Sequence, residues 1–272
     1  MPTFRTFPLI GALLFALPLL AGVDDDWKET CALAQRASAA KDYARAEALY
    51  GKALHQAELF GKEDVRVAFS LQSLGATMRL EKKLSEAEAN LQHATSVFAA
   101  GPGSQSREYA EAHFDLAQVL VDEGKYEQAS QSLQTLLPIL EQTLGLHDQK
   151  LATAYCMQGD TFRLLKRYSS AEDPLTRCAH MREEDSGIAT ADFGAAANSL
   201  ALVYQYLGKT QSADRYFRFA ASIREQALGM LSPEFAETLE AHAVLLHQLG
   251  RDAEAKQKEK LAAQVRAHLA RK

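Results

Sequence analysis

Small residues recur along this chain at a fixed interval. One series lies 41, 42, 42, 42 and 42 positions apart and consists of Ala46, Ala87, Ala129, Ala171, Ala213 and Ala255. A second series precedes each of these by twelve positions and consists of Ala34, Gly75, Ala117, Gly159, Ala201 and Ala243. Glycines repeat with the same 42-residue spacing at Gly61, Gly103, Gly145, Gly187 and Gly229. Three series with one period predict six copies of the same structural unit.

Large apolar residues surround the small ones at helical offsets. Three positions after the first small residue, the chain carries Met78, Leu120, Phe162, Tyr204 and Leu246. Four positions after the second small residue, it carries Tyr50, Leu91, Leu133, Leu175 and Phe217. Residues three, four and seven positions apart share one face of an α-helix. Each unit is therefore predicted to be a hairpin of two helices in contact at the small residues. Such hairpins must stack to bury their apolar faces.

Composition supports helices and argues against a sheet. The 272 residues include 47 Ala and 38 Leu but only 9 Val and 4 Ile. Ala and Leu favour helices, whereas strands are rich in β-branched residues. We therefore expect an all-α fold. The net charge of −5 gives no reason to expect a nucleic-acid-binding surface, because such surfaces are normally basic.

The order of large, small, aromatic and Ala positions resembles the tetratricopeptide repeat. The 42-residue period and the fragments GKYEQA at Gly124–Ala129 and ALG at Ala227–Gly229 are similar to the kinesin-light-chain type of that repeat. The resemblance implies a right-handed α-solenoid of six helix-turn-helix repeats, each with a first helix of about 13 residues and a longer second helix. The repeats are expected at about residues 27–67, 68–109, 110–151, 152–193, 194–235 and 236–272, in a single domain of residues 23–272.

Residues 1–22 differ from the repeats and have the features of a secretory signal peptide. Arg5 precedes an uncharged run of 18 residues, Thr6–Val23, and three aspartates follow it. Cleavage is expected near Ala21 or Gly22, which predicts a periplasmic or secreted protein. Two alternatives stay open: an uncleaved anchor that holds the protein on the membrane facing the periplasm, and a buried core helix. The first remains open because 18 residues is close to the length of a membrane span.

The three cysteines offer no obvious pair. Cys31, Cys156 and Cys178 are odd in number, and the last two lie 22 positions apart without a CxxC motif. We expect all three thiols to be free and packed in helix interfaces. A disulfide or a metal site is the less favoured alternative.

Enzyme motifs are absent from the sequence. It contains no HExxH motif, no Gly-rich phosphate loop and no GxSxG motif, and its eight His residues are scattered. The sequence therefore predicts a protein that is not an enzyme. No catalytic residue, metal site or cofactor is expected.

The resemblance also implies a binding groove, because first helices line the concave side of tetratricopeptide solenoids. The groove positions lie three before, and one, four and five after, the first small residue. The site residues implied in this way are Gln72, Arg79, Phe114, Gln118, Asp160, Arg163, Asn198, Leu202 and Tyr206. The Lys and paired Asn with which some members of the family hold a C-terminal carboxylate are missing. An apolar strip flanked by Arg79 and Arg163 would suit an extended peptide.

These observations predict an exported, non-enzymatic scaffold that binds a peptide or protein segment in its groove. One alternative is a structural or assembly factor of the cell envelope, which self-associates or is tethered by an uncleaved N-terminal helix. Another is a cytosolic cargo adaptor, against which the leader argues. No nucleic-acid partner is expected, and membrane contact is expected only if the N-terminal segment stays uncleaved.

The last repeat is expected to cover the end of the stack. Asp252 stands where other units carry Tyr, and Glu259 stands where unit five carries Phe217. A covering helix needs such a polar outer face. Residues 250–272 carry seven Lys or Arg against three acids. That excess leaves open a basic element that docks on anionic lipid or an acidic partner.

Overall fold

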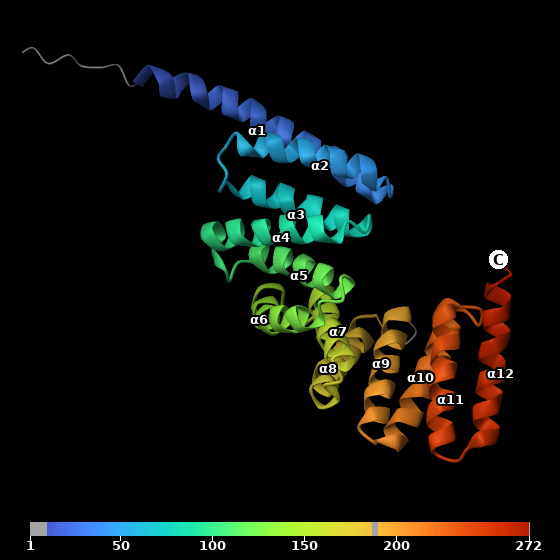
Figure 1. Ribbon diagram of the computed structural model, residues 1–272. Helices are drawn as coiled ribbons and strands as arrows, with labels where there is room; N and C mark the ends of the chain where they lie inside the picture. Colours follow the sequence, from blue (N-terminus) through green and yellow to red (C-terminus); the bar gives the residue numbers. More distant parts are fainter. Residues whose placement is uncertain (1–9, 187–189, 272) are drawn as a thin grey trace, which may run out of the picture. The chain divides into compact units, whose positions relative to one another are not determined.

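The computed structural model describes residues 10–186 and 190–271, with side chains from Gly22 onward except at 185–189. These residues form helices and turns, with no strand among them. The chain divides into two compact units, Met1–Glu123 and Gly124–Lys272 (Figure 1). The all-α helical repeat solenoid predicted from the sequence is confirmed.

The first unit contains two helical hairpins and one further helix. Its helices are α1 (Ile10–Ala39), α2 (Tyr43–Glu58), α3 (Val65–Leu80), α4 (Leu84–Phe98), the π-helical turn η1 (Ala99–Gly103) and α5 (Arg107–Asp122). The hairpins are α1–α2 and α3–α4, and each packs on its successor through the contacts of α2 with α3 and of α4 with α5.

The second unit contains one helix and three hairpins. Its helices are α6 (Tyr126–Leu144), α7 (Gln149–Leu164), α8 (Tyr168–Ser186), α9 (Ala191–Tyr206), α10 (Thr210–Leu228), α11 (Pro233–Gln248) and α12 (Asp252–Leu269). The hairpins are α7–α8, α9–α10 and α11–α12, and successive hairpins pack through α8 with α9 and α10 with α11.

Helix lengths follow the expectation in part. From the second repeat onward, first helices have 16 residues rather than about 13, because each begins three residues before the expected boundary. Four of the six second helices are longer, with 18 or 19 residues. The boundary between the two units follows Glu123, inside the expected third repeat. The single domain of residues 23–272 and its six repeat boundaries stay a prediction.

The two small residues of each hairpin lie at its tightest contact. The Ala residues of both series are buried at no more than 2 % exposure. At Gly159 a Cβ atom would lie 2.4 Å from the Leu175 Cγ, and at Gly75 it would lie 2.7 Å from the Leu91 Cγ. The facing leucines are themselves fully buried. Close approach of the two helices therefore explains the periodic small residues.

The turn before each second helix has a residue with positive φ. The series is Lys41, Lys82, Gly124, Lys166, Gly208 and Gly250, with φ between 59° and 74°. Glycine adopts this left-handed conformation without steric cost, whereas lysine does not. Three of the six turns therefore carry a strained lysine.

Ion pairs connect the turns before α4 and α10 to the preceding repeat. Lys209 lies 2.6 Å from Glu172, and Lys83 lies 2.5 Å from Glu47. Each carboxylate directly follows the second small residue of the preceding repeat. The pairs are partly exposed, so each adds about 0–1 kcal/mol and mainly helps to set the stacking register.

The expectation of three free thiols is wrong for two of them. Cys156 on α7 and Cys178 on α8 form a disulfide, with their Cα atoms 5.2 Å apart. The hairpin brings together residues that lie 22 positions apart in the chain. Cys31 is free and half-buried, as expected, and burial raises the pKa of its thiol to about 11.

The predicted leader lies partly outside the described residues, since 1–9 are not described. Helix α1 runs without interruption from Ile10 into the first repeat. It contacts α3 through an ion pair of Asp24 with Arg66 at 2.7 Å and a hydrogen bond from Trp27 Nε1 to Ser70 Oγ at 3.0 Å. No helix in the described part of the chain is long and apolar enough to span a membrane.

The last helix, α12, packs against α11 through a narrow stripe. Val265 and Ala262 are buried against Phe235 and Leu239, and Leu261 is partly buried beside them. Both acids singled out in the sequence, at positions 252 and 259, are exposed and bond to His247 at 2.6 and 3.1 Å. The role of α12 as a covering helix stays a prediction.

Candidate functional site

Four of the nine predicted site residues lie in the first unit, on the neighbouring helices α3 and α5. Gln72 donates a hydrogen bond to Asp115 at 2.8 Å, and Arg79 forms an ion pair with Asp122 at 3.0 Å. Both contacts bridge successive first helices. Phe114 is buried at 5 % exposure, whereas Gln118 is partly exposed. Two of the four therefore bond to the adjacent helix, and a third belongs to the core.

The other five predicted residues lie in the second unit, on α7 and α9. Asp160 accepts hydrogen bonds from Arg163 at 2.9 Å and from Ser199 of α9 at 2.8 Å. Asn198 is buried at 4 % exposure, and its Oδ1 has no hydrogen-bond partner among the described residues. Leu202 is partly buried against the core around Phe217. The charges at this surface are therefore paired internally.

Tyr206, the fifth of these residues, is the most exposed aromatic side chain of the set. It is 62 % exposed, and its ring stacks on Tyr168 with centroids 4.3 Å apart and an interplanar angle of 5°. Leu164 on α7 and Val244 on α11 are 43 % and 53 % exposed. All three occupy groove positions one or five residues after the first small residue. The first helices of the second unit thus present an apolar surface, defined by Leu164, Tyr206 and Val244 and called here the first-helix surface.

Leu164, Tyr168 and Val244 were not among the nine predicted site residues, although the positional rule includes Leu164. Val244 follows the first small residue of the last repeat, so extending the positional rule to that repeat finds it. Tyr168 begins a second helix, and nothing in its sequence position points to a stacking contact. The nine predicted residues fall into a set of four in one unit and a set of five in the other.

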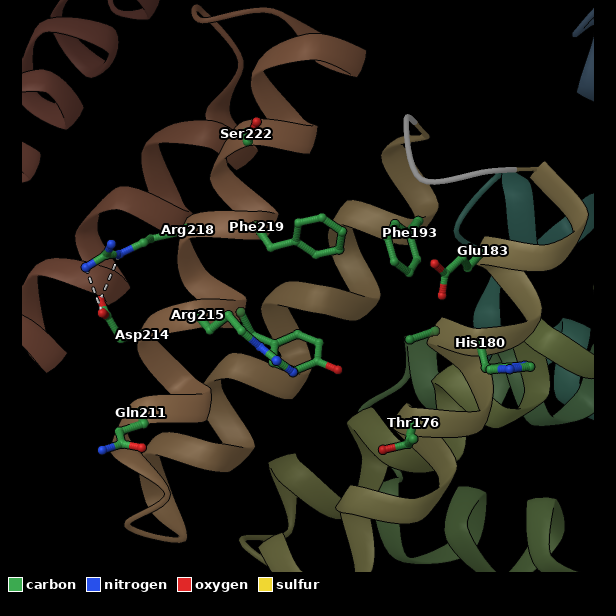
Figure 2. A pocket seen from close by; sticks show the side chains of 12 residues that line it. Thr176, His180, Glu183, Phe193, Gln211, Asp214, Arg215, Arg218, Phe219 and Ser222 are labelled. Carbon is green, nitrogen blue, oxygen red and sulfur yellow. Dashed lines mark hydrogen bonds and ion pairs between the residues drawn. The ribbon is translucent and has the colours of Figure 1, made fainter.

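A second candidate site in the second unit is a cavity of about 660 Å³ between α8 and α10. None of the nine predicted residues lines it. Figure 2 shows Phe193 and Phe219 opposite each other, with His180 and Glu183 on α8 and Arg215 on α10. The two phenylalanine rings meet edge to face, with centroids 5.5 Å apart. The volume is typical of ligand-binding pockets.

Charged groups surround this cavity. Arg218 lies 2.8 Å from Asp214, while Arg215 lies over the Tyr216 ring at 5.4 Å. Burial by itself raises the pKa of Asp214, but hydrogen bonds from His242 and Arg251 outweigh it and lower the pKa. Asp214 is thus held as a carboxylate. Among the described side chains, no ion pair is formed by Arg215 or Glu183.

Metal binding has no support in the described residues. No group of three or more His, Cys, Asp or Glu side chains lies together there in a way that could hold an ion.

A stack of helical hairpins with small residues at each crossing defines a helical-repeat solenoid. Residues 108–184 and 194–242 match the family described as "Tetratricopeptide repeat". The chain is a tetratricopeptide-repeat protein with a fold of the kinesin-light-chain-like type. No curated protein matches it.

Solved structures of low sequence identity share this fold. BtubC (BKLC) from P. vanneervenii has a TM-score of 0.68 and 17% identity, over 84% of this chain and 92% of that one. A putative kinesin light chain of Podosopora anserina with nearly identical TPR-like repeats has a TM-score of 0.62 and 17% identity, over 75% of this chain and 96% of that one. YrrB, described as a TPR protein with an unusual peptide-binding site, has a TM-score of 0.56 and 16% identity, over 78% and 91%.

These findings support a protein–protein interaction scaffold, and neither family match is to an enzyme. Proteins of this repeat class bind protein or peptide partners.

Proposed function

We propose that this protein holds an extended segment of a partner protein against the first-helix surface. The observation that carries the proposal is the exposure of Leu164, Tyr206 and Val244 on three successive first helices of the second unit. Apolar side chains on successive helices can accept side chains of one extended peptide. The description of YrrB as having a peptide-binding site, although unusual, adds a precedent within the fold.

The polar groups at this surface favour a peptide with apolar rather than acidic side chains, because these groups already bond to one another. Arg163 already pairs with Asp160, and Gln205 donates to Gln248 at 3.1 Å. An acidic ligand would have to displace an existing partner of the arginine. Apolar side chains, by contrast, would lose exposed surface against Tyr206 and Val244 at about 25 cal/mol per Å².

A peptide library displayed on phage, panned against the purified full chain, would test this proposal. Selected peptides should be rich in apolar residues, and Tyr206→Ala with Val244→Ser should weaken their binding at least tenfold in fluorescence anisotropy. Leu228→Ser is a matched control, because Leu228 is an exposed apolar residue at the end of a second helix. Equal affinity of the peptides for wild type and the double variant would show that the first-helix surface does not bind them.

We also propose that the protein is exported and that residues 1–22 are a cleaved signal peptide. Cleavage near Ala21 or Gly22 would keep the contacts of Asp24 with Arg66 and of Trp27 with Ser70. A disulfide between Cys156 and Cys178 fits an oxidising compartment, because thiols stay reduced in the cytosol. The intact mass of protein from the envelope fraction should correspond to a start at about residues 22–24. Recovery of the full-length chain only in detergent would favour the anchor.

A further inference from the structure

Contacts between successive repeats follow a charge pattern. At three of these joints, a cation four positions before the second small residue bonds to an acid that directly follows the second small residue of the preceding repeat. The three pairs are Lys83 with Glu47, Lys209 with Glu172 and Arg251 with Asp214, at 2.5, 2.6 and 3.0 Å. The turn of one repeat therefore lies beside the second helix of the repeat before it.

The first and last described repeats carry the opposite charges at these positions. The turn of the first repeat has Asp42 in place of the cation, and α12 in the last repeat has Lys256 in place of the acid. Both side chains are exposed, and neither forms an ion pair within the described residues. Each therefore lacks the ionic partner that the joints between repeats supply.

A second contact between repeats has the same relation to the two ends. Arg224 of α10 donates hydrogen bonds to the Glu234 carbonyl at 2.8 Å and to Thr238 Oγ1 at 2.7 Å, both on α11. Counted from the small residues, the equivalents are Arg266 on α12 and Asp25 and Glu29 on α1. Both acids are exposed. Arg266 bonds to Glu240 through Nε and Nη2, so its third nitrogen can donate to a further acceptor.

A third contact is apolar between repeats and charged at the two ends. Phe217 of α10 and Leu245 of α11 belong to one core cluster. Their equivalents are Glu259 on α12 and Arg36 on α1, and both are exposed. Arg36 forms no ion pair within the described part of the chain. At each of these three contacts, α12 and the first repeat therefore carry opposite charges.

We propose that copies of this protein associate head to tail, with α12 of one copy packing on the first repeat of the next as α10 packs on α11. The pairs formed across this contact are Lys256 with Asp42, Arg266 with Asp25 and Glu29, and Glu259 with Arg36. Opposite charges at matched positions fix the register of such a contact. The two copies contribute different surfaces, so the contact is heterologous and further copies can add in sequence. It does not depend on the proposed function.

The face of α12 fits a second copy better than a lipid surface. Ala263 and Ala267 lie seven and eleven positions after Lys256 and share its helical face, which therefore has no large apolar side chain to insert into a membrane. An anionic surface would attract Lys256 but repel Glu259, whereas the first repeat complements both. The ion pairs are exposed and each adds little, so the association should be weak and sensitive to salt.

Sedimentation velocity of the full chain tests the proposal. Wild type should form a concentration-dependent series of oligomers between about 10 µM and 1 mM at low salt. Raising the salt from about 50 to 500 mM should weaken the association at least tenfold, because it screens exposed charges. Lys256→Glu and Asp42→Lys should each weaken it at least tenfold, because each places like charges opposite one another.

Both substitutions are compatible with the fold, because other repeats carry the same residues. Glu47 and Glu172 occupy the position of Lys256 in their own repeats. Lys83 and Lys209 occupy the position of Asp42, and α4 and α10 begin there without a side-chain cap.

A mixture of the two variants separates charge pairing from general effects. Lys256→Glu copies and Asp42→Lys copies in equal amounts should associate as wild type does, because each contact then again joins an acid to a lysine. Lys52→Glu, which changes an exposed lysine of α2, is a matched control and should behave as wild type.

Four outcomes would overturn the proposal. The first is wild type that stays monomeric up to about 1 mM at low salt. The second is a single variant that associates as strongly as wild type, which would place the contact elsewhere. The third is a mixture of the two variants that stays monomeric. The fourth is binding of wild type, but not of Lys256→Glu, to phosphatidylglycerol vesicles without self-association, which would assign α12 to a lipid surface.

Discussion

Removing the Cys156–Cys178 disulfide should destabilise the α7–α8 hairpin. The bond closes a loop between residues 22 positions apart. In the chain-entropy account, such a bond lowers the entropy of the unfolded chain by about 11 cal/mol/K, which corresponds to about 3 kcal/mol at 25 °C. A change of this size lowers the ratio of folded to open hairpin on the order of 10²-fold.

The perturbation is best made by Cys156→Ser together with Cys178→Ala. Alanine is the natural residue at the second position, because Ala94, Ala220 and Ala262 occupy it in other repeats and are buried. The packing loss at that position is therefore small, and the entropic term dominates. Reduction of the wild type by dithiothreitol should have the same effect without any substitution.

Hydrogen exchange read by mass spectrometry is the appropriate assay, because stacked repeats open locally and need not melt in one step. Amides of α7 and α8 should exchange on the order of 10²-fold faster after reduction, while those of α2 and α3 should not change. The variant Cys31→Ala controls for the free thiol. Unfolded, non-reduced protein should show one reactive thiol. The reasoning would be refuted by three reactive thiols in the unfolded, non-reduced protein. It would also be refuted by exchange rates in α7 that do not change on reduction.

Three further expectations follow from the backbone and the core. Gly159→Ala should lower stability by about 1–3 kcal/mol in urea unfolding, because the new Cβ lies 2.4 Å from Leu175, whereas Gly51→Ala, with open space around it, should stabilise by about 0.5–1 kcal/mol. Lys166→Gly should raise stability by up to about 1 kcal/mol by relieving a φ of 59°, and Lys166→Ala should not. Burial lowers the pKa of His242 in the folded protein. Below about pH 6.5 the unfolded chain therefore binds a proton that the folded protein does not, and stability should fall as the pH falls. His242→Gln should make the melting temperature less dependent on pH in this range.

The fold was readable from the sequence because its causes are local and repeat. A small residue every 42 positions has one explanation, the close crossing of two helices, and the structure confirms it at Gly75 and Gly159. Offsets of three and four positions place large residues on one helical face regardless of the neighbours. The same positional rule located Tyr206 and Leu164 on an exposed part of the first helices.

The candidate sites were only partly readable, because a position on a helix does not say which side chain it meets. Arg79 and Arg163 were expected to be available for ligand binding, yet each forms an ion pair with an aspartate. Phe114 and Asn198 stand at groove positions but are buried. Whether such a side chain is paired, buried or exposed depends on the distance to the adjacent helix and on the length of that helix's side chains.

The repeat period, the hairpins and the helical faces were determined by the sequence alone, since each follows from backbone geometry within one repeat. Pairing and cavities were decided by the tertiary structure. Cys156 meets Cys178 only because two helices antiparallel in a hairpin bring their Cα atoms to 5.2 Å. The cavity between α8 and α10 is lined by side chains from three helices, among them Glu183, Phe193 and Phe219. Both outcomes depend on side-chain volume and distance across helices, which a periodic pattern does not encode.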